Sequence, residues 1–426
     1  MLTKKILIIG LFISSFGLFS FMNLSKDSPR PVSSRSAVAI LQWNEIAFNA
    51  FGGTQYQHSL MASRINAMVH LAIHDALNGI EEKYSRYAFA GVDKNADPFA
   101  AAAVASYEVL VHEVPGNKKY LDSVLENALN GLKEGNAKAK GIALGKAAAR
   151  AVINKRANDG SAGNPIVQIP AANNPGAYQV VAPFNFVFAP YWQDVKPFAI
   201  GKSNQFRSAP FPSLTSDKYT KAFEEVKQTG KVNSSTRTPD QTAYAKFWYE
   251  FSEAGWNRVA RTVVSNQKLN MLEAARLFAL VDMAIADAYI AGWDSKFHYN
   301  FWRPYTAIRN AGHDGNDATM ADASWEPSEP TPPVHDYPST HSALGNAAAT
   351  VLALLLGDNT AFSMTSPTAY PAGTIRSFNS FSQAANENAD SRVRAGIHFR
   401  FSCEAGQEMG NKIGAWTVAN CLKPIK

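Results

Sequence analysis

The sequence predicts an all-α protein, a large helical bundle with few or no strands. Apolar residues recur at intervals of three and four along several long stretches, which is the period of an amphipathic helix. Strict alternation of apolar and polar residues, the pattern of a half-buried strand, is scarce. With 46% hydrophobic and 18% charged residues among 426, the chain can bury a large core. Because amphipathic helices bury their apolar stripes against one another, a bundle follows.

Four stretches with this period precede the last third of the chain, and long connections separate some of them. Small residues are frequent on the apolar stripes, which permits close helix contact. Residues 159–216 are rich in Gly, Pro, Asn and aromatic residues, as in a lid or wrapping loop, and equally as in a packed surface connection. Residues 310–338 form a second, polar loop. The four stretches are residues 64–81, 97–111, 137–154 and 269–293.

The N-terminus has the character of an export signal. Lys4 and Lys5 precede the apolar run 6–22. We therefore expect residues 1–25 to be a signal peptide or an N-terminal anchor, and residues 36–426 to form a helical domain. No other apolar run approaches the roughly 20 residues of a membrane span. The prediction is an exported protein, periplasmic or secreted, with no membrane contact beyond this segment.

Charge and cysteine content argue against two further classes of protein. The net charge is +6 and no run is rich in Lys or Arg, so we expect no nucleic-acid partner. Cys403 and Cys421 are the only cysteines. On one straight helix they would lie about 27 Å apart, beyond the roughly 7 Å Cα limit of a disulfide. We expect two free thiols.

The first chemical motif is a lysine and an arginine seven positions apart. On a helix this spacing is about two turns, so Lys296 and Arg303 are predicted to project from one face, with Pro304 ending or kinking the helix. Such a pair usually marks a solvated face. The residues between them, 297–302, are mostly aromatic, which favours partial burial.

The second motif, residues 338–341, reads Pro-Ser-Thr-His and opens a predicted helix. The apolar stripe of this helix runs to Leu355, and Gly357 is well placed just past its end. Ser339 alone would be an ordinary helix cap. However, the unpaired N–H groups and positive dipole of a helix start also make a natural anion seat. An imidazole titrates near neutrality, so His341 beside a bound oxyanion is suited to acid–base work.

The third motif comprises Arg392, which follows Ser391, and His398. Six positions on a straight helix place two side chains on different faces. Gly396 makes a break between Arg392 and His398 plausible, with His398 leading into the next helix, predicted from residue 399. A lone histidine here would more often be structural than a ligand.

Taken together, the three motifs resemble the signature of the superfamily of vanadium-dependent haloperoxidases and type 2 phosphatidic acid phosphatases. The family pattern is K-x6-R-P, P-S-G-H and S-R-x5-H. The motif region, residues 293–398, has the same order and spacings, with Thr340 where the family usually has glycine. A side chain there crowds the anion seat, and a left-handed backbone would be costly. Alternatively, Thr340 supplies an extra hydroxyl donor.

The resemblance implies a role for each matching residue. Lys296, Arg303 and Arg392 would hold the oxygens of vanadate, with Ser339 donating through its hydroxyl and Thr340 through its backbone N–H.

For the two histidines, the resemblance implies that His341 is the acid–base residue. His398 would be the axial ligand to vanadium, or the nucleophile toward phosphorus in a phosphatase.

The length of the helical scaffold before the first motif and the soluble character of the chain favour the haloperoxidase branch. Trp293, three residues before Lys296, is similar to an aromatic that borders the halide pocket in that branch, although it could be an ordinary core residue. Val334 falls at a second position of that pocket, and His335 beside it is unusual. The predicted function is therefore oxidation of halide by hydrogen peroxide, with vanadate as cofactor.

Other functions stay open. The same pocket could serve an acid phosphatase that acts on a phosphoester through a phospho-histidine, or an exported oxyanion-binding protein without turnover. His70 and His74 are four positions apart on a predicted helix with Asp75 adjoining, a spacing that can bind zinc, although no third ligand is evident.

Overall fold

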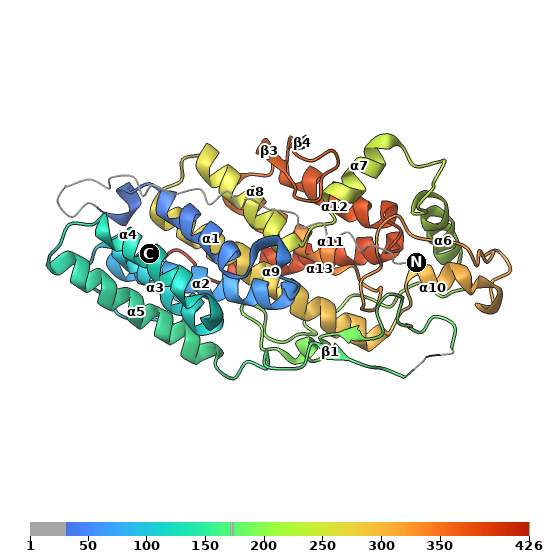
Figure 1. Cartoon of the computed structure of the whole chain (residues 1–426), viewed down its shortest axis with the longest axis horizontal. Coiled ribbons are helices and arrows are strands. Elements are labelled where there is room, and N and C mark those ends of the chain that lie inside the picture. The colour runs from blue at the N-terminus through green and yellow to red at the C-terminus, as the bar shows by residue number, and fades with distance from the viewer. Residues whose placement is uncertain (1–30, 171, 173, 426) are drawn as a thin grey trace, which may run out of the picture.

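The computed structural model describes residues 31–170, 172 and 174–425, so the predicted export segment at residues 1–25 lies outside the described part. The described chain consists of α-helices joined by loops, with two small two-stranded sheets (Figure 1). The prediction of an all-α bundle with few strands is confirmed. The helices are α1 (Val38–Ala50), α2 (Ser59–Ile80), α3 (Pro98–Glu113), α4 (Lys118–Asn130), α5 (Asn136–Arg156), α6 (Asp217–Thr229), α7 (Pro239–Phe247), α8 (Ser252–Asn266), α9 (Met271–Tyr299), α10 (Pro304–Arg309), α11 (Thr340–Leu356), α12 (Phe381–Arg394) and α13 (Arg400–Asn420). The strands are β1 (Ile166–Val167), β2 (Val187–Phe188), β3 (Phe362–Thr365) and β4 (Ile375–Phe378), paired antiparallel as β1–β2 and β3–β4.

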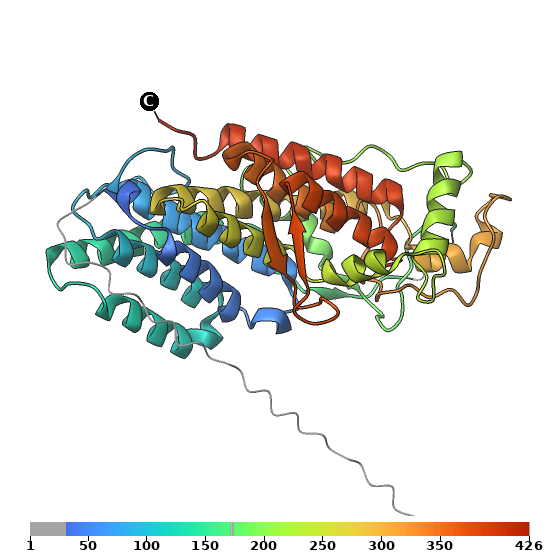
Figure 2. The same ribbon diagram turned by 90° about the horizontal axis from the view of Figure 1, so that it is seen from above.

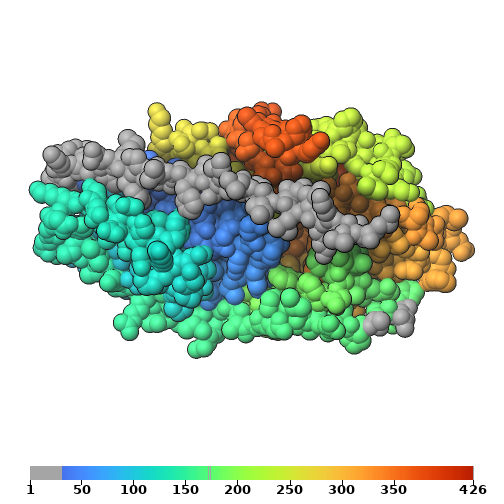
Figure 3. Space-filling model, in the orientation of Figure 1, coloured from blue at the N-terminus to red at the C-terminus, as the bar shows by residue number. Residues whose placement is uncertain are grey.

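The helices form an elongated molecule in which α9 runs between the two ends. In both ribbon views α1–α5 gather at one end, whereas α6, α7 and α10 lie toward the other (Figures 1 and 2). The space-filling view shows the same division on one face of the molecule (Figure 3). Helix α9 connects the two groups of helices, because it packs against α2 on one side and against α11 and α13 on the other.

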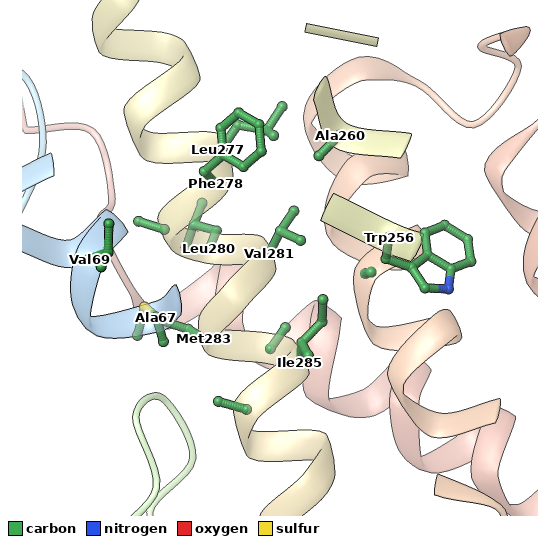
Figure 4. Packing of buried hydrophobic residues seen from close by; sticks show 14 of the residues in the cluster. Ala67, Val69, Trp256, Ala260, Leu277, Phe278, Leu280, Val281, Met283 and Ile285 are labelled. Carbon is green, nitrogen blue, oxygen red and sulfur yellow. The ribbon is translucent and has the colours of Figure 1, made fainter. Parts of the chain in front are cut away.

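Helix α9 is the centre of the core. It is buried on nearly all sides from Met271 to Lys296, as expected of a helix that is apolar all round. Figure 4 shows its side chains, Val281 among them, between α2, which carries Val69, and α8, which carries Trp256. Because α9 is held on several sides, the side chains in its last turn have fixed positions.

The end of α9 differs from the sequence prediction. Asn300 adopts a left-handed backbone with φ 49°, which ends the helix after Tyr299. Arg303 then serves as N-cap of α10, and Pro304 occupies its first position, where a missing N–H costs nothing. The prediction that Lys296 and Arg303 project from one helix was therefore wrong. They come from two helices joined by a tight bend.

The long connection 159–216 is packed against α9, the second of the two alternatives. The carboxylate of Asp287 accepts hydrogen bonds of 2.6–2.9 Å from the backbone N–H groups of residues 198–200. The guanidinium of Arg207 donates two bonds of 2.7 Å to Asp294. Two carboxylates on one helix thus anchor the connection along the side of the core.

Glycines bring α13 into close contact with α11. Gly406, Gly410 and Gly414 repeat at every fourth position, and a Cβ on any of them would overlap a backbone carbonyl of α11. The first lies against the carbonyl of Ser339, at the very start of α11. This stripe therefore sets the position of the α11 N-terminus.

The cysteine prediction is confirmed, because Cys403 and Cys421 are both free thiols. Among the helices of the described chain, none combines the length and the apolar character needed to cross a bilayer.

We predict that Gly410→Ala lowers the free energy of unfolding by about 1–3 kcal/mol, because the added methyl group must push α13 away from α11. Urea unfolding measures the change. Gly312→Ala is the matched control, since its Cβ would meet nothing within 4 Å. Equal stability of the two variants would contradict the close packing.

Candidate active site

The three motifs meet at the N-terminus of α11. Lys296 and Arg303 approach from the end of α9 and the bend after it, and Arg392 from the last turn of α12. His398 lies in the connection between α12 and α13, after Gly396, whose φ of 80° breaks the helix as predicted. Lys296, Arg303 and Arg392 are each at most 3% exposed, so these cations do not lie on a solvated surface face.

Backbone carbonyls hold the lysine. The ammonium of Lys296 donates to the carbonyl oxygens of His335 and Asp336 at 2.6 and 2.9 Å. Burial, followed by the charge of Arg303, lowers the pKa of Lys296 well below its ordinary value. The lysine thus fixes the loop that leads into Ser339 and keeps one N–H available.

Backbone carbonyls also hold Arg303. Its Nε donates to the carbonyl of Val334 at 2.7 Å, and one terminal nitrogen donates to the carbonyl of Ile397 at 2.8 Å. The same nitrogen lies 3.0 Å from Nε2 of His398. Because a guanidinium can only donate, Nε2 of His398 must be the acceptor, which places the ring proton on Nδ1.

Asp336 completes this arrangement, and the sequence analysis missed it. One carboxylate oxygen lies 2.8 Å from Nδ1 of His398, close enough for strong attraction although the angle is not that of a hydrogen bond. The other oxygen accepts from the hydroxyl of Ser402. Burial raises the pKa of Asp336 to about 6. Its place three residues after a proline-rich stretch and three before Ser339 was the only available signal.

A second missed group is the backbone carbonyl of Trp248. It accepts from Nε2 of His341 at 2.8 Å and from Arg392 at 3.2 Å. Since a carbonyl cannot donate, the His341 proton sits on Nε2, and Nδ1 is the nitrogen that can take up another. A peptide oxygen, which no side-chain pattern encodes, therefore orients His341.

The site carries more buried positive charge than its neighbours neutralise. Besides Lys296, burial lowers the pKa of Arg303 and lowers that of Arg392 to about 10. Asp336 is the acid beside them, 3.9 Å from Arg303. Nε of Arg392 is buried without a hydrogen-bond partner among the described residues. This combination fits a tetrahedral oxyanion, which supplies both negative charge and acceptors.

The pKa of both histidines lies well below the ordinary value. Burial is the main cause for each, and Arg392 adds to it for His341, whereas Arg303 and Lys296 add to it for His398. Both rings are therefore neutral. Nε2 of His398, which accepts from Arg303 in this structure, is the unprotonated nitrogen that could bond to the central atom of an oxyanion in place of that hydrogen bond.

Ser339 and Thr340 form the start of α11. The hydroxyl oxygen of Ser339 accepts from the N–H and the hydroxyl of Ser342 at 3.4 and 3.0 Å, so its own hydrogen stays available to an anion. Thr340 has a helical backbone, without the left-handed φ that would have been costly. Its methyl group fills the space beside Gly292 of α9, where a Cβ would overlap it. A glycine on α9 thus leaves room for the side chain of Thr340, which therefore does not crowd the start of α11.

The two candidate halide-pocket residues are buried beside the site. Trp293 donates its indole N–H to the carbonyl of Phe188 at 3.2 Å, and its ring meets that of Tyr289 at 5.7 Å. Only the ring of Trp293 is thus available to border a halide. Val334 is buried, and its carbonyl is used by Arg303.

The unusual His335 points into an aromatic cluster. Its ring lies 4.5 Å from that of Tyr178 and 4.6 Å from that of Phe297, and burial lowers its pKa to about 3. It is a neutral packing residue.

The zinc alternative is not supported. His70 pairs with Asp282 at 2.6 Å, whereas His74 pairs with Asp75 at 3.1 Å. In the described residues, no group of three or more potential ligands is placed to hold a metal ion.

We predict that Gly292→Ala destabilises the protein by about 1–3 kcal/mol, and that adding Thr340→Gly or Thr340→Ser recovers at least about 1 kcal/mol. The reason is that each change at residue 340 removes the methyl group that the new Cβ would overlap. A double-mutant cycle of urea unfolding measures the coupling. Strictly additive changes would show that the two residues do not share this space.

With the geometry established, the chain can be compared with known proteins. A family model described as the VCPO second helical-bundle domain matches residues 276–426. A vanadium chloroperoxidase of Curvularia inaequalis is 28% identical over 313 residues, which are 58% of this chain and 51% of that protein. The chain therefore spans about half the length of the curated relative that it matches.

Solved structures give more complete matches. The crystal structure of the first bacterial vanadium-dependent iodoperoxidase is 25% identical with a TM-score of 0.79, and the match covers 94% of this chain and 100% of that one. A holo-type bacterial vanadium-dependent chloroperoxidase is 17% identical with a TM-score of 0.67, over 93% and 96% of the two chains. The second match concerns the fold alone.

Proposed function

Because the chain belongs to the haloperoxidase-like branch of the vanadium haloperoxidase and type 2 phosphatidic acid phosphatase superfamily, we propose that it is a vanadate-dependent haloperoxidase. It uses hydrogen peroxide to oxidise halide, and it acts after export, in the periplasm or the medium. The observation that carries the proposal is the cluster of three buried cations around the α11 N-terminus, where Asp336 is the one carboxylate within ion-pair distance of them among the described residues. The relatives' dependence on vanadium supports vanadate as the anion.

The residues of this chain would hold vanadate from all sides. Lys296, Arg303 and Arg392 neutralise its charge, while Ser339 donates through its hydroxyl and Thr340 through its backbone N–H. When bound, vanadate supplies a Lewis acid that activates hydrogen peroxide toward halide.

The two histidines have separate roles. Nε2 of His398 would be the ligand atom, with Asp336 keeping the ring proton on the opposite nitrogen, Nδ1. His341, held through Nε2 by the Trp248 carbonyl, takes up and returns a proton at Nδ1. Trp293 and Val334 would border the halide, with the apolar surface favouring a large, weakly hydrated anion.

The alternative function is a phosphatase. The unprotonated Nε2 of His398 is the observation that favours it, because the same lone pair can attack phosphorus. Two parallel assays separate the functions: bromination or iodination of a phenolic dye with vanadate and peroxide, and hydrolysis of p-nitrophenyl phosphate. We expect activity in the first assay only. Hydrolysis alone would indicate a phosphatase, and vanadate binding without either activity an oxyanion-binding protein.

We predict that His398→Ala loses vanadate retention by at least about tenfold, whereas His341→Ala retains vanadate and loses rate by about 10²–10⁴-fold. The first change removes a bond to the cofactor and the second a proton carrier. Equilibrium dialysis measures binding and dye halogenation measures rate. Unchanged vanadate binding in His398→Ala would contradict the axial-ligand role.

We predict that Asp336→Asn weakens vanadate binding by about 10–100-fold, because an amide no longer favours the ring proton on Nδ1 of His398. Ser402→Ala is the matched control, since it removes only the bond to the other carboxylate oxygen. Dialysis and urea unfolding are measured together. A loss of affinity that simply follows a loss of stability, equal in both variants, would argue against the orienting role.

A further inference from the structure

A pocket of about 480 Å³ lies next to the candidate active site but outside it. Three separate segments line it, and it opens to solvent. They are the end of α7 with the turn after it, the loop before α11, and the loop between β3 and β4. Its lining includes Lys246, Tyr249, Glu329 and Tyr370. The volume is in the range of pockets that take a small organic molecule, roughly 300–1,000 Å³.

Tyr249 is the wall shared by the pocket and the active site. The guanidinium of Arg392 lies 5.4 Å from the centre of the Tyr249 ring. The preceding residue, Trp248, supplies the carbonyl that holds His341 and Arg392. The Tyr249 hydroxyl donates to the carbonyl of Pro330 at 2.7 Å, which fixes the ring in this position. Only the ring of Tyr249 therefore separates a molecule in the pocket from Arg392.

The lining offers aromatic faces and a cation. Tyr370 is 71% exposed, an unusual position for a large ring that contributes to no core, and the ammonium of Lys246 lies 4.9 Å from its centre. Lys246 has no ion-pair partner among the residues that the structure describes, although Glu329 lines the same pocket. Burial raises the pKa of Glu329, whereas the neighbouring charges of Lys246 and Arg392 lower it.

We infer that this pocket binds the organic acceptor of the reaction, an aromatic ring that carries a phenol hydroxyl and a carboxylate. The inference rests on the proposed haloperoxidase function. The ring packs between Tyr249 and Tyr370, and the carboxylate pairs with Lys246. Hypohalous acid formed at the candidate active site then reacts with the ring. A carbon–halogen bond forms and the halogen–oxygen bond breaks, and the displaced ring proton leaves with the hydroxide as water.

Binding is tested first, without vanadate or peroxide, by titrating the full chain with 4-hydroxybenzoate. We expect Lys246→Met to weaken binding about three- to fivefold, the size of a partly exposed ion pair, and Tyr370→Ala to weaken it similarly. Lys412→Met is the control, because this lysine is exposed on α13 and pairs with Glu408. Equal binding by Lys246→Met, Lys412→Met and the unaltered protein would overturn the proposal, as would a lack of binding.

Kinetics then separate the acceptor site from the proposed function. We expect Lys246→Met to raise the KM for 4-hydroxybenzoate while leaving unchanged both the rate of iodide oxidation without acceptor and the KM for neutral phenol. An unchanged KM for 4-hydroxybenzoate would overturn the proposal. Lysine-dependent binding in a protein that oxidises no halide would support the pocket as an aromatic-acid site and reject the haloperoxidase function.

Discussion

The structure depends on how three buried cations are held without being neutralised. Lys296, Arg303 and Arg392 are anchored mainly by backbone carbonyls, those of residues 334–336, 397 and 248. A carbonyl satisfies an N–H donor but contributes only a partial charge, so most of the positive charge remains. Carboxylates in those places would have formed stable ion pairs and closed the site to anions. The excess charge is therefore a property of the backbone path as much as of the three side chains.

That backbone path depends in turn on small residues. The glycine stripe of α13 allows α11 to approach so closely that the carbonyl of Ser339 touches it, and Gly292 of α9 receives the methyl group of Thr340 from the other side. The first turn of α11 is thus held between two helices by residues without side chains. A helix N-terminus oriented in this way presents its free N–H groups in one direction only, toward the cations.

The sequence predicted most of the side chains of this site, with Asp336 as the exception, and missed the groups that belong to the backbone. The periodic stretches correspond to α2, α3, α5 and α9, and the break at Gly396 is present because a local residue choice determines each of them. The bend after Tyr299 was missed because it depends on a left-handed asparagine, a conformation that sequence permits but does not require. The role of the Trp248 carbonyl could not be predicted either, because every residue has a carbonyl and only the fold determines which one lies beside His341 and Arg392. Asp336 lay beside the motif, yet nothing in its spacing distinguished it from an ordinary loop acid.

The candidate halide-pocket residue Trp293 is held by contacts other than those that hold the three cations. The anion seat is built from the three motifs, whereas Trp293 is held by the carbonyl of Phe188, and two acids on the same helix, Asp287 and Asp294, bind the connection that carries Phe188. The position of the indole ring is therefore determined by the connection 159–216 and not by the motifs themselves. The same connection also contacts the anion side, because the N–H of Tyr178 donates to the carbonyl of Asn300 and the N–H of Trp302 donates to the carbonyl of Gly176, in the bend that carries Arg303. The connection 159–216 therefore helps to position both the indole ring of Trp293 and the bend before Arg303, and the spacing of the motifs contains no information about either contribution.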